Sequence, residues 1–253
     1  DTVNAEHGFV SMQPMSSGDF LVSWLDGRYT VGMSHGNGKG AMTVRAAILN
    51  PDGKKLNEWE LDNRVCDCCG TANGISEKGP VVVYRDRTEN EVRDMSIVRY
   101  VNNQWTEPVP VFNDHWEIAG CPVNGPSLSS LNNALVMGWF TAADGKPKVN
   151  LIFSSNSGNT FSQPIQVDQG NPLGRVKVAL IEPQTAFISW MEGSQIVAAK
   201  VESSGIISQR YSLATSSNDR SSGFPQIALN NNKIVIAWVD TESKKVKTGI
   251  LIL

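Results

Sequence analysis

The chain has 253 residues, of which 40% are hydrophobic and 19% are charged, and it carries a net charge of −3. This length allows one large all-β domain, and the composition argues against a disordered chain. The slightly acidic balance excludes the basic surface of a nucleic-acid-binding protein, and no apolar run reaches the roughly 20 residues that cross a bilayer.

A short sequence phrase recurs five times along the chain. Each copy is an apolar run that ends in an aromatic residue and then turns polar. The aromatic residues are spaced 60, 55, 51 and 48 positions apart. A period near 50 residues, with room for several short strands, is typical of a β-propeller. The aromatic positions are Trp24, Tyr84, Trp139, Trp190 and Trp238.

Strand signals around each phrase predict an all-β propeller built from four-stranded antiparallel blades, and five blades can be recognised in this chain. The phrase fits the second strand of a blade, which is buried on both faces and therefore continuously apolar. A second repeat, in 105–111 and 161–167, contains prolines that suit a fourth strand at an outer edge. We expect one domain over 1–253, with blades over 7–61, 71–112, 124–168, 175–215 and 223–253.

The last predicted blade has no fourth strand of its own, because Leu253 follows directly after its third strand. An open sheet edge invites pairing with another strand. We therefore expect an N-terminal segment beyond this sequence, or a partner chain, to complete the propeller.

The four cysteines lie in two loops that precede the first strands of neighbouring blades. Such loops lie close together in a propeller, so the four sulfurs are expected to be near one another. Four cysteines allow three full pairings, and their spacing does not choose among them. One alternative is a disulfide between the loops, with or without a link between adjacent cysteines; the other is a redox or metal site for zinc or copper. The residues are Cys66, Cys68, Cys69 and Cys121.

Charged residues collect where first strands start and second strands end, which is one mouth of the central channel. Guanidinium groups hold carboxylates bidentately, so the arginines predict a pocket for an anionic ligand, although ion pairs between blades are the alternative. The expected ligand-binding residues are Arg28, Arg85, Asp86, Arg87, Asn124 and Arg175. The other charged residues at the mouth are His7, Asp26, Asp67, Glu192 and Asp240. The glycine-rich stretch 32–40 is expected to form a loop that can close over this mouth.

Several strings resemble the bacterial sialidase-like propellers with Asp-box (BNR) repeats, a family also described as exo-α-sialidase-like. The string 154–161 is similar to the Asp-box, with Asn156 in place of Asp and Phe161 in place of Trp. The strings 6–10, 65–69, 79–87, 118–126 and 171–175 also resemble the family, and the two that contain cysteines, 65–69 and 118–126, are the most specific. Position 70 departs from it, because Gly70 stands where the family has Gln. The resemblance implies six blades, of which this chain lacks the N-terminal one.

The resemblance also implies a periplasmic or secreted protein that binds a glycan or another anionic ligand at the channel mouth. Sialidases use three arginines, a Tyr–Glu nucleophile pair and an Asp acid/base, and these roles do not transfer cleanly onto this sequence. We therefore expect a non-catalytic binding protein. The alternatives are an exo-α-sialidase-type hydrolase and a cysteine-based metal or redox protein on a propeller scaffold.

Overall fold

The computed structural model describes residues 2–31, 40–219 and 222–253, so most of the glycine-rich stretch lies outside the described residues. These residues form twenty β-strands and one short 3-10 turn, which confirms the predicted all-β class. The chain divides into two compact units, Asp1–Pro126 and Ser127–Leu253. Among the described residues, no helix is long and apolar enough to span a membrane.

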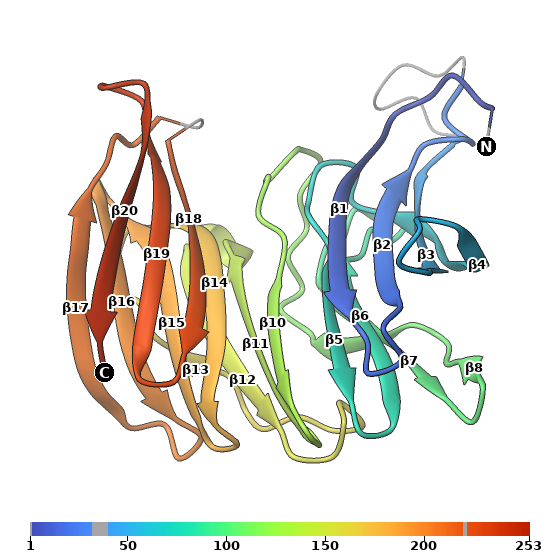
Figure 1. Cartoon of the computed structure of the whole chain (residues 1–253). Helices are drawn as coiled ribbons and strands as arrows, with labels where there is room; N and C mark the ends of the chain where they lie inside the picture. The colour runs from blue at the N-terminus through green and yellow to red at the C-terminus, as the bar shows by residue number, and fades with distance from the viewer. Residues whose placement is uncertain (1, 32–39, 220–221) are drawn as a thin grey trace. The chain divides into compact units, whose positions relative to one another are not determined.

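The first unit contains two antiparallel sheets (Figure 1). In the second of them, both short outer strands pair with β7. The first sheet consists of β1 (His7–Pro14), β2 (Phe20–Asp26), β3 (Met42–Leu49) and β4 (Lys55–Val65). The second consists of β5 (Ala72–Ser76), β6 (Gly79–Arg85), β7 (Met95–Val101), β8 (Gln104–Trp105) and β9 (Val109–Phe112).

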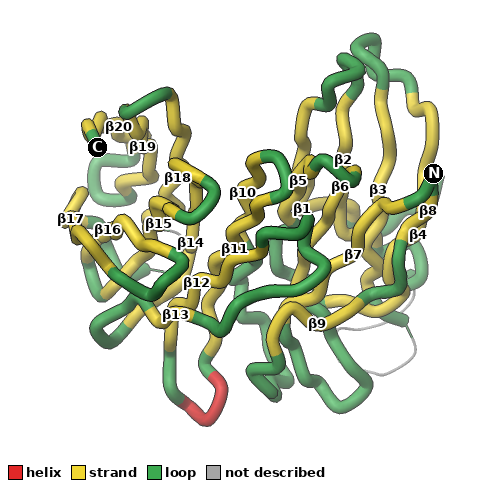
Figure 2. Tube along the Cα trace, turned by 90° about the horizontal axis from the view of Figure 1, so that it is seen from below, coloured by secondary structure: helices red, strands yellow, loops and turns green. Residues whose placement is uncertain are grey.

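The second unit contains three antiparallel sheets, each with its strands in sequence order. The 3-10 turn Ala143–Gly145 joins two strands of the first of them (Figure 2). The third sheet has three strands among the described residues. This agrees with the prediction that the last blade has no fourth strand of its own. The sheets are β10 (Ser127–Leu131), β11 (Ala134–Thr141), β12 (Lys148–Ser154) and β13 (Ile165–Gln166); β14 (Pro172–Glu182), β15 (Thr185–Glu192), β16 (Gln195–Glu202) and β17 (Ile207–Thr215); and β18 (Gly223–Asn230), β19 (Lys233–Asp240) and β20 (Lys245–Ile252).

The repeated phrase forms the second strand of every sheet, as predicted. Tyr84, Trp139 and Trp190 are fully buried, because β6, β11 and β15 have packed side chains on both faces. The outer strands of the second and third sheets are shorter than the repeat that predicted them. Regular strand pairing there covers Gln104–Trp105, Val109–Phe112 and Ile165–Gln166, and Pro108 and Pro164 next to these strands have no N–H to donate.

Three first strands share a bulge near their start. The register shifts directly after a glycine, at Gly8–Phe9 in β1, Gly174–Arg175 in β14 and Gly223–Phe224 in β18. The residue after each glycine has a left-handed φ, 56° for Phe9, 58° for Arg175 and 47° for Phe224. Bulky side chains rarely adopt this conformation, and bulges re-aim the side chains that they carry.

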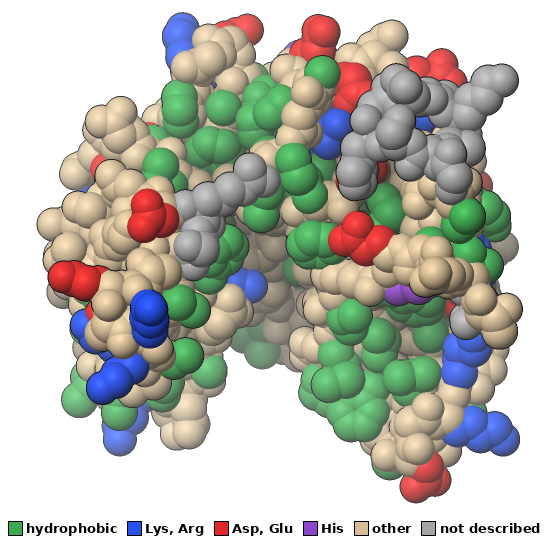
Figure 3. Space-filling view, turned by 90° about the horizontal axis from the view of Figure 1, so that it is seen from above, with side chains coloured by type: hydrophobic (Ala, Val, Ile, Leu, Met, Phe, Trp, Pro, Cys, Tyr) green, Lys and Arg blue, Asp and Glu red, His purple; other side chains and the backbone are tan. Residues whose placement is uncertain are grey.

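Two sheets expose apolar side chains on one face. In β1, Val10 and Met12 are 66% and 61% exposed, and in β20 Val246, Ile250 and Ile252 are 65–70% exposed. Alternate residues of each strand share a face, so these side chains form rows. Figure 3 shows hydrophobic side chains gathered at the surface.

Candidate functional site

The loop with three cysteines is anchored at the end of β6. Val65 and Asp86 form an isolated β-bridge, and the Cys66 amide donates to the Arg85 carbonyl at 3.0 Å. The end of β4 therefore continues along β6 before the chain turns into the cysteine loop.

The four sulfurs form one cluster. A disulfide joins Cys68 to Cys121, so the expected link between the two loops is present and the adjacent Cys68 and Cys69 are not linked. Cys66 and Cys69 are buried free thiols with their sulfurs 2.9 Å apart, and the Cys66 sulfur lies 3.9 Å from the Cys68 sulfur. The cluster is thus a dithiol beside a disulfide.

Two buried arginines surround the dithiol. Arg85 donates from Nε and Nη2 to the Asn124 carbonyl, at 3.0 and 2.9 Å, and its guanidinium lies 4.8 Å from the centre of the Trp116 ring. Arg93 donates from Nη1 to the Cys66 sulfur at 3.5 Å. The predicted site residues Arg85 and Asn124 therefore hold the loop before β10 against the cysteine loop.

The dithiol is electrostatically asymmetric. The hydrogen bond with Cys69 lowers the pKa of Cys66 to about 6, although burial opposes the shift, and the positive charges of Arg85 and Arg93 add to it. Burial and the same hydrogen bond raise the pKa of Cys69 well above its usual range. Thiolates are the reactive form of cysteine, and Cys66 is the thiol of the pair that deprotonates more readily.

A pocket of about 450 Å³ opens beside the disulfide, entirely within the first unit. It combines carboxylates, guanidinium groups, an aromatic ring and backbone from the loop that ends at Cys121. Its lining residues are Glu6, Phe9, Asp67, Cys68, Arg87, Glu91, Arg93, Ala119, Gly120 and Cys121.

Arg87 is the centre of the polar network in this pocket. Its Nη1 donates to both oxygens of Asp67, at 3.1 and 3.0 Å, and its Nε and Nη2 donate to Glu91, at 3.0 and 2.7 Å. Arg93 donates from Nη2 to Oε2 of Glu91 at 2.7 Å, an oxygen that also accepts from Arg87 Nε at 3.1 Å. Burial alone would raise the pKa of Glu91, but the hydrogen bonds from both arginines outweigh it and lower that pKa.

Sequence reasoning placed Asp67, Arg87 and the cysteines in a site but missed Phe9, Glu91 and Arg93. Phe9 reaches the pocket through the left-handed bulge, and the glycine before it was the available signal. Glu91 is positioned by pairing between 91–94 and 115–118. In that pairing the Ile118 amide donates to the Glu91 carbonyl at 2.9 Å.

The two loops meet at a close backbone contact. A side-chain carbon at Gly125 would lie 2.2 Å from the Gly70 carbonyl oxygen and 2.7 Å from its nitrogen. The contact therefore requires glycine at 125. A side-chain carbon at Gly70 would meet no atom within 4 Å, so position 70 has space for a side chain.

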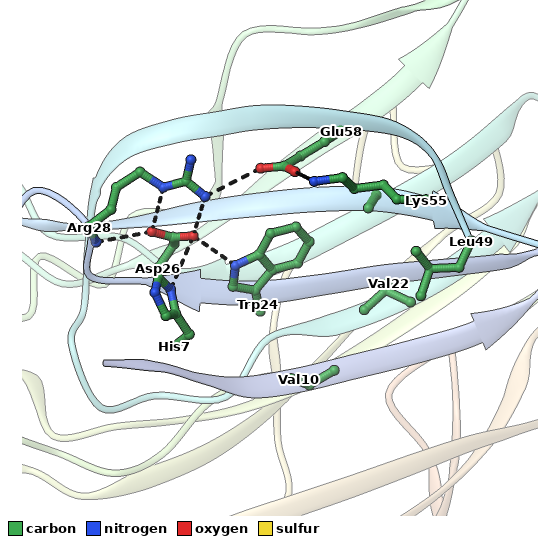
Figure 4. A pocket seen from close by; sticks show the side chains of 10 residues that line it. His7, Val10, Val22, Trp24, Asp26, Arg28, Leu49, Lys55 and Glu58 are labelled. Carbon is green, nitrogen blue, oxygen red and sulfur yellow. Dashed lines mark hydrogen bonds and ion pairs between the residues drawn. The ribbon is translucent and has the colours of Figure 1, made fainter. Parts of the chain in front are cut away.

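A second pocket, of about 270 Å³, lies on the first sheet and brings together His7, Asp26 and Arg28 (Figure 4). The Asp26 carboxylate accepts from Arg28 at 2.8 and 2.7 Å and from the Trp24 indole at 2.9 Å, and it lies 3.3 Å from His7 Nδ1. Burial would raise the pKa of Asp26, but the Arg28 hydrogen bonds hold it well below its usual range. The pocket includes Val10 and so belongs to the exposed face of the sheet.

The remaining predicted residues lie elsewhere. Asp86 follows β6, and burial together with Asp62 and Asp94 raises its pKa to about 6. In the second unit, Arg175 stacks on the Phe224 ring at 4.8 Å, Glu192 accepts from the Trp190 indole at 2.7 Å, and Asp240 pairs with Lys247. Glu192 thus repeats the bond between Trp24 and Asp26, two residues after the aromatic position.

No protein-family model matches this sequence, and none of the curated proteins does. Among solved structures the chain is similar to a Hadza microbial sialidase, with a TM-score of 0.61 at 10% identity, covering 99% of this chain and 59% of that one. It is also similar to the six-bladed fucose-recognising lectin of Aleuria aurantia, with a TM-score of 0.53 at 10% identity, covering 98% and 92%. A putative glycoside hydrolase from Parabacteroides distasonis gives a TM-score of 0.51 at 11% identity, covering 98% and 87%.

Identities this low establish the fold alone. The sheets of this chain are blades of a β-propeller, and the chain spans 59% of the length of the sialidase.

Proposed function

We propose that the pocket beside the disulfide binds a neutral saccharide. The observation that carries this proposal is a network of paired donors and acceptors, Arg87 with Asp67 and Glu91, next to the exposed ring of Phe9. Sugar hydroxyls both donate and accept hydrogen bonds, and the C–H face of a pyranose packs on aromatic rings. A pocket of about 450 Å³ accommodates one or two sugar rings.

The charge balance favours a neutral ligand over an anionic one. The lining has three carboxylates, Glu6, Asp67 and Glu91, against the guanidinium groups of Arg87 and Arg93, which sums to −1. The donors of Arg87 already bond to Asp67 and Glu91. A sialic acid carboxylate would have to displace one of these acceptors and would meet net negative charge.

The same network favours binding over hydrolysis. A glycosidase needs one carboxyl that remains protonated to serve as the acid. Two arginines lower the pKa of Glu91, which is the reverse of what an acid requires. No tyrosine is among the described residues that line the pocket, so a sialidase-type Tyr nucleophile has no place here.

Calorimetry with a panel of neutral monosaccharides, and with sialic acid for comparison, tests the proposal. Phe9→Leu removes the ring and keeps an apolar side chain, so the variant should lose saccharide affinity by about tenfold, the range of one aromatic contact. Leu56→Ala is the control, because Leu56 is exposed and does not line the pocket. Binding of sialic acid but of no neutral sugar would contradict the proposal, as would turnover of a fluorogenic sialoside.

A further blade is proposed to cover the exposed apolar faces of the first and last sheets. Val10 and Met12 in β1, and Ile250 and Ile252 in β20, form rows that a neighbouring sheet would bury in a propeller. A segment of the same protein or a partner chain would supply that blade, with 1–253 forming one domain. Size-exclusion chromatography of a longer version of the chain, with hydrogen exchange on β1 and β20, checks this: protection should rise on both strands.

We also propose an extracytoplasmic location for the protein. The Cys68–Cys121 disulfide supports this, because disulfides persist in oxidising compartments. Fractionation of the source cells checks it, and recovery of the protein in the cytosolic fraction would contradict it.

A further inference from the structure

We propose that the four cysteines form a dithiol–disulfide exchange site, which moves a disulfide between the pocket-facing pair Cys68–Cys121 and the buried pair Cys66–Cys69. This inference does not depend on the saccharide proposal. It rests on the placement of a buried dithiol directly behind a disulfide that lines the pocket.

The distances between the sulfur atoms indicate the order of the exchange steps. The Cys66 sulfur lies 3.9 Å from the Cys68 sulfur and 2.9 Å from the Cys69 sulfur, so it contacts both its target and its resolving partner. The Arg93 guanidinium, 3.5 Å from the Cys66 sulfur, stabilises negative charge there. Cys66 and Cys69 are buried, whereas Cys68 lines the pocket and Cys121 is exposed, so the exchange meets solvent only at the Cys68–Cys121 pair.

The exchange is balanced without an external oxidant. The Cys66 thiolate attacks the Cys68 sulfur, the Cys68–Cys121 bond breaks, and Cys121 leaves as a thiolate that takes a proton from water. The Cys69 thiol then attacks the Cys66 sulfur, the Cys66–Cys68 bond breaks, and the proton of Cys69 passes to the Cys68 sulfur, which leaves as a thiol. One disulfide and two thiols are present before and after.

After the exchange, two thiols line the pocket in place of the Cys68–Cys121 disulfide. Cys68 and Cys121 become accessible thiols, and the covalent link between the 66–70 loop and the 119–121 segment is gone. An external disulfide is then the substrate class. Attack by Cys121 forms a mixed disulfide, Cys68 resolves it and re-forms the Cys68–Cys121 bond, and two substrate thiols leave. The buried pair has supplied the two electrons.

Trapping with iodoacetamide, followed by non-reducing digestion and mass spectrometry, tests the internal step. In the wild-type protein, alkylation of Cys121 should accumulate together with a Cys66–Cys69 disulfide. In Cys69→Ser the relay should stop after one step, giving alkylated Cys121 with a Cys66–Cys68 disulfide. In Cys66→Ser the labelling of Cys121 should be at least about tenfold slower, because the attacking thiolate is missing. Cys69→Ser is the matched control for Cys66→Ser, since each variant removes one buried thiol.

Glutathione disulfide is the probe for the external step. The wild-type protein should release two glutathione molecules per chain and end with two internal disulfides, whereas Cys66→Ser should release none. The proposal is wrong if wild type and Cys66→Ser label Cys121 at equal rates. It is also wrong if purified wild type has four titratable thiols that hold zinc or copper. If Cys66→Ser does not fold, the wild-type trap still decides: intact Cys68–Cys121 after prolonged trapping refutes the relay.

Discussion

Substituting Gly125 by alanine should separate the two loops that build the pocket. The new side-chain carbon would lie 2.2 Å from the Gly70 carbonyl oxygen, and the opposing atoms are backbone. The loops must therefore move apart by about 1 Å to reach ordinary contact. That movement also pulls the Asn124 carbonyl away from Arg85, which now donates two hydrogen bonds to it at 3.0 and 2.9 Å.

The expected loss of stability is the sum of two costs, the overpacking at Gly125 and the weakened hydrogen bonds from Arg85. Overpacking costs about 1–3 kcal/mol, and weakening a buried hydrogen bond to a charged group costs about 1.5–3 kcal/mol. Gly125→Ala should therefore lower the free energy of unfolding by about 3–5 kcal/mol, and Tm by about 10 °C for a chain of this size.

Urea unfolding followed by fluorescence measures the loss, and Gly70→Ala is the matched control. A side-chain carbon at Gly70 meets nothing within 4 Å, so that variant should stay within about 0.5 kcal/mol of wild type. If Gly125→Ala is as stable as Gly70→Ala, the backbone contact between the loops does not exist as described.

Two further predictions concern stability. Burial raises the pKa of Asp86 to about 6, above the ordinary value near 4, so the stability it contributes is present below pH 4 and lost as pH rises through 6. Asp86→Asn should therefore raise Tm at pH 8 but not at pH 4, while Asp52→Asn at an exposed turn should change neither; a pH-independent difference would refute the assignment. Asn73 is buried and bonds to the Ser23 hydroxyl at 2.6 Å and the Ser11 carbonyl at 2.9 Å. Asn73→Ala should cost about 2–3 kcal/mol in urea unfolding, and a loss below about 0.5 kcal/mol would show that the network is dispensable.

The propeller class could be predicted from sequence because the second strands are buried on both faces. Burial on both faces produces the continuous apolar runs that end at Tyr84, Trp139 and Trp190. The fourth strands were harder to predict. Their repeat is visible in 105–111 and 161–167, but proline removes the donors that would make them regular strands.

The site could be predicted only in part. The cysteine strings indicated that the two loops meet, but the partner of Cys121 depends on loop geometry that spacing does not encode. Glu91 joins the site because 91–94 pairs with 115–118, a contact between segments with no shared pattern. Phe9 enters through a left-handed bulge, and only the glycine before it hints at that.

The most direct test of the proposed site is calorimetric titration of the wild-type chain and Phe9→Leu with neutral monosaccharides. The pocket beside the disulfide predicts saturable binding by wild type and about tenfold weaker binding by Phe9→Leu, at unchanged Tm. Equal affinity in the two proteins, or no binding of any neutral sugar by wild type, would contradict it.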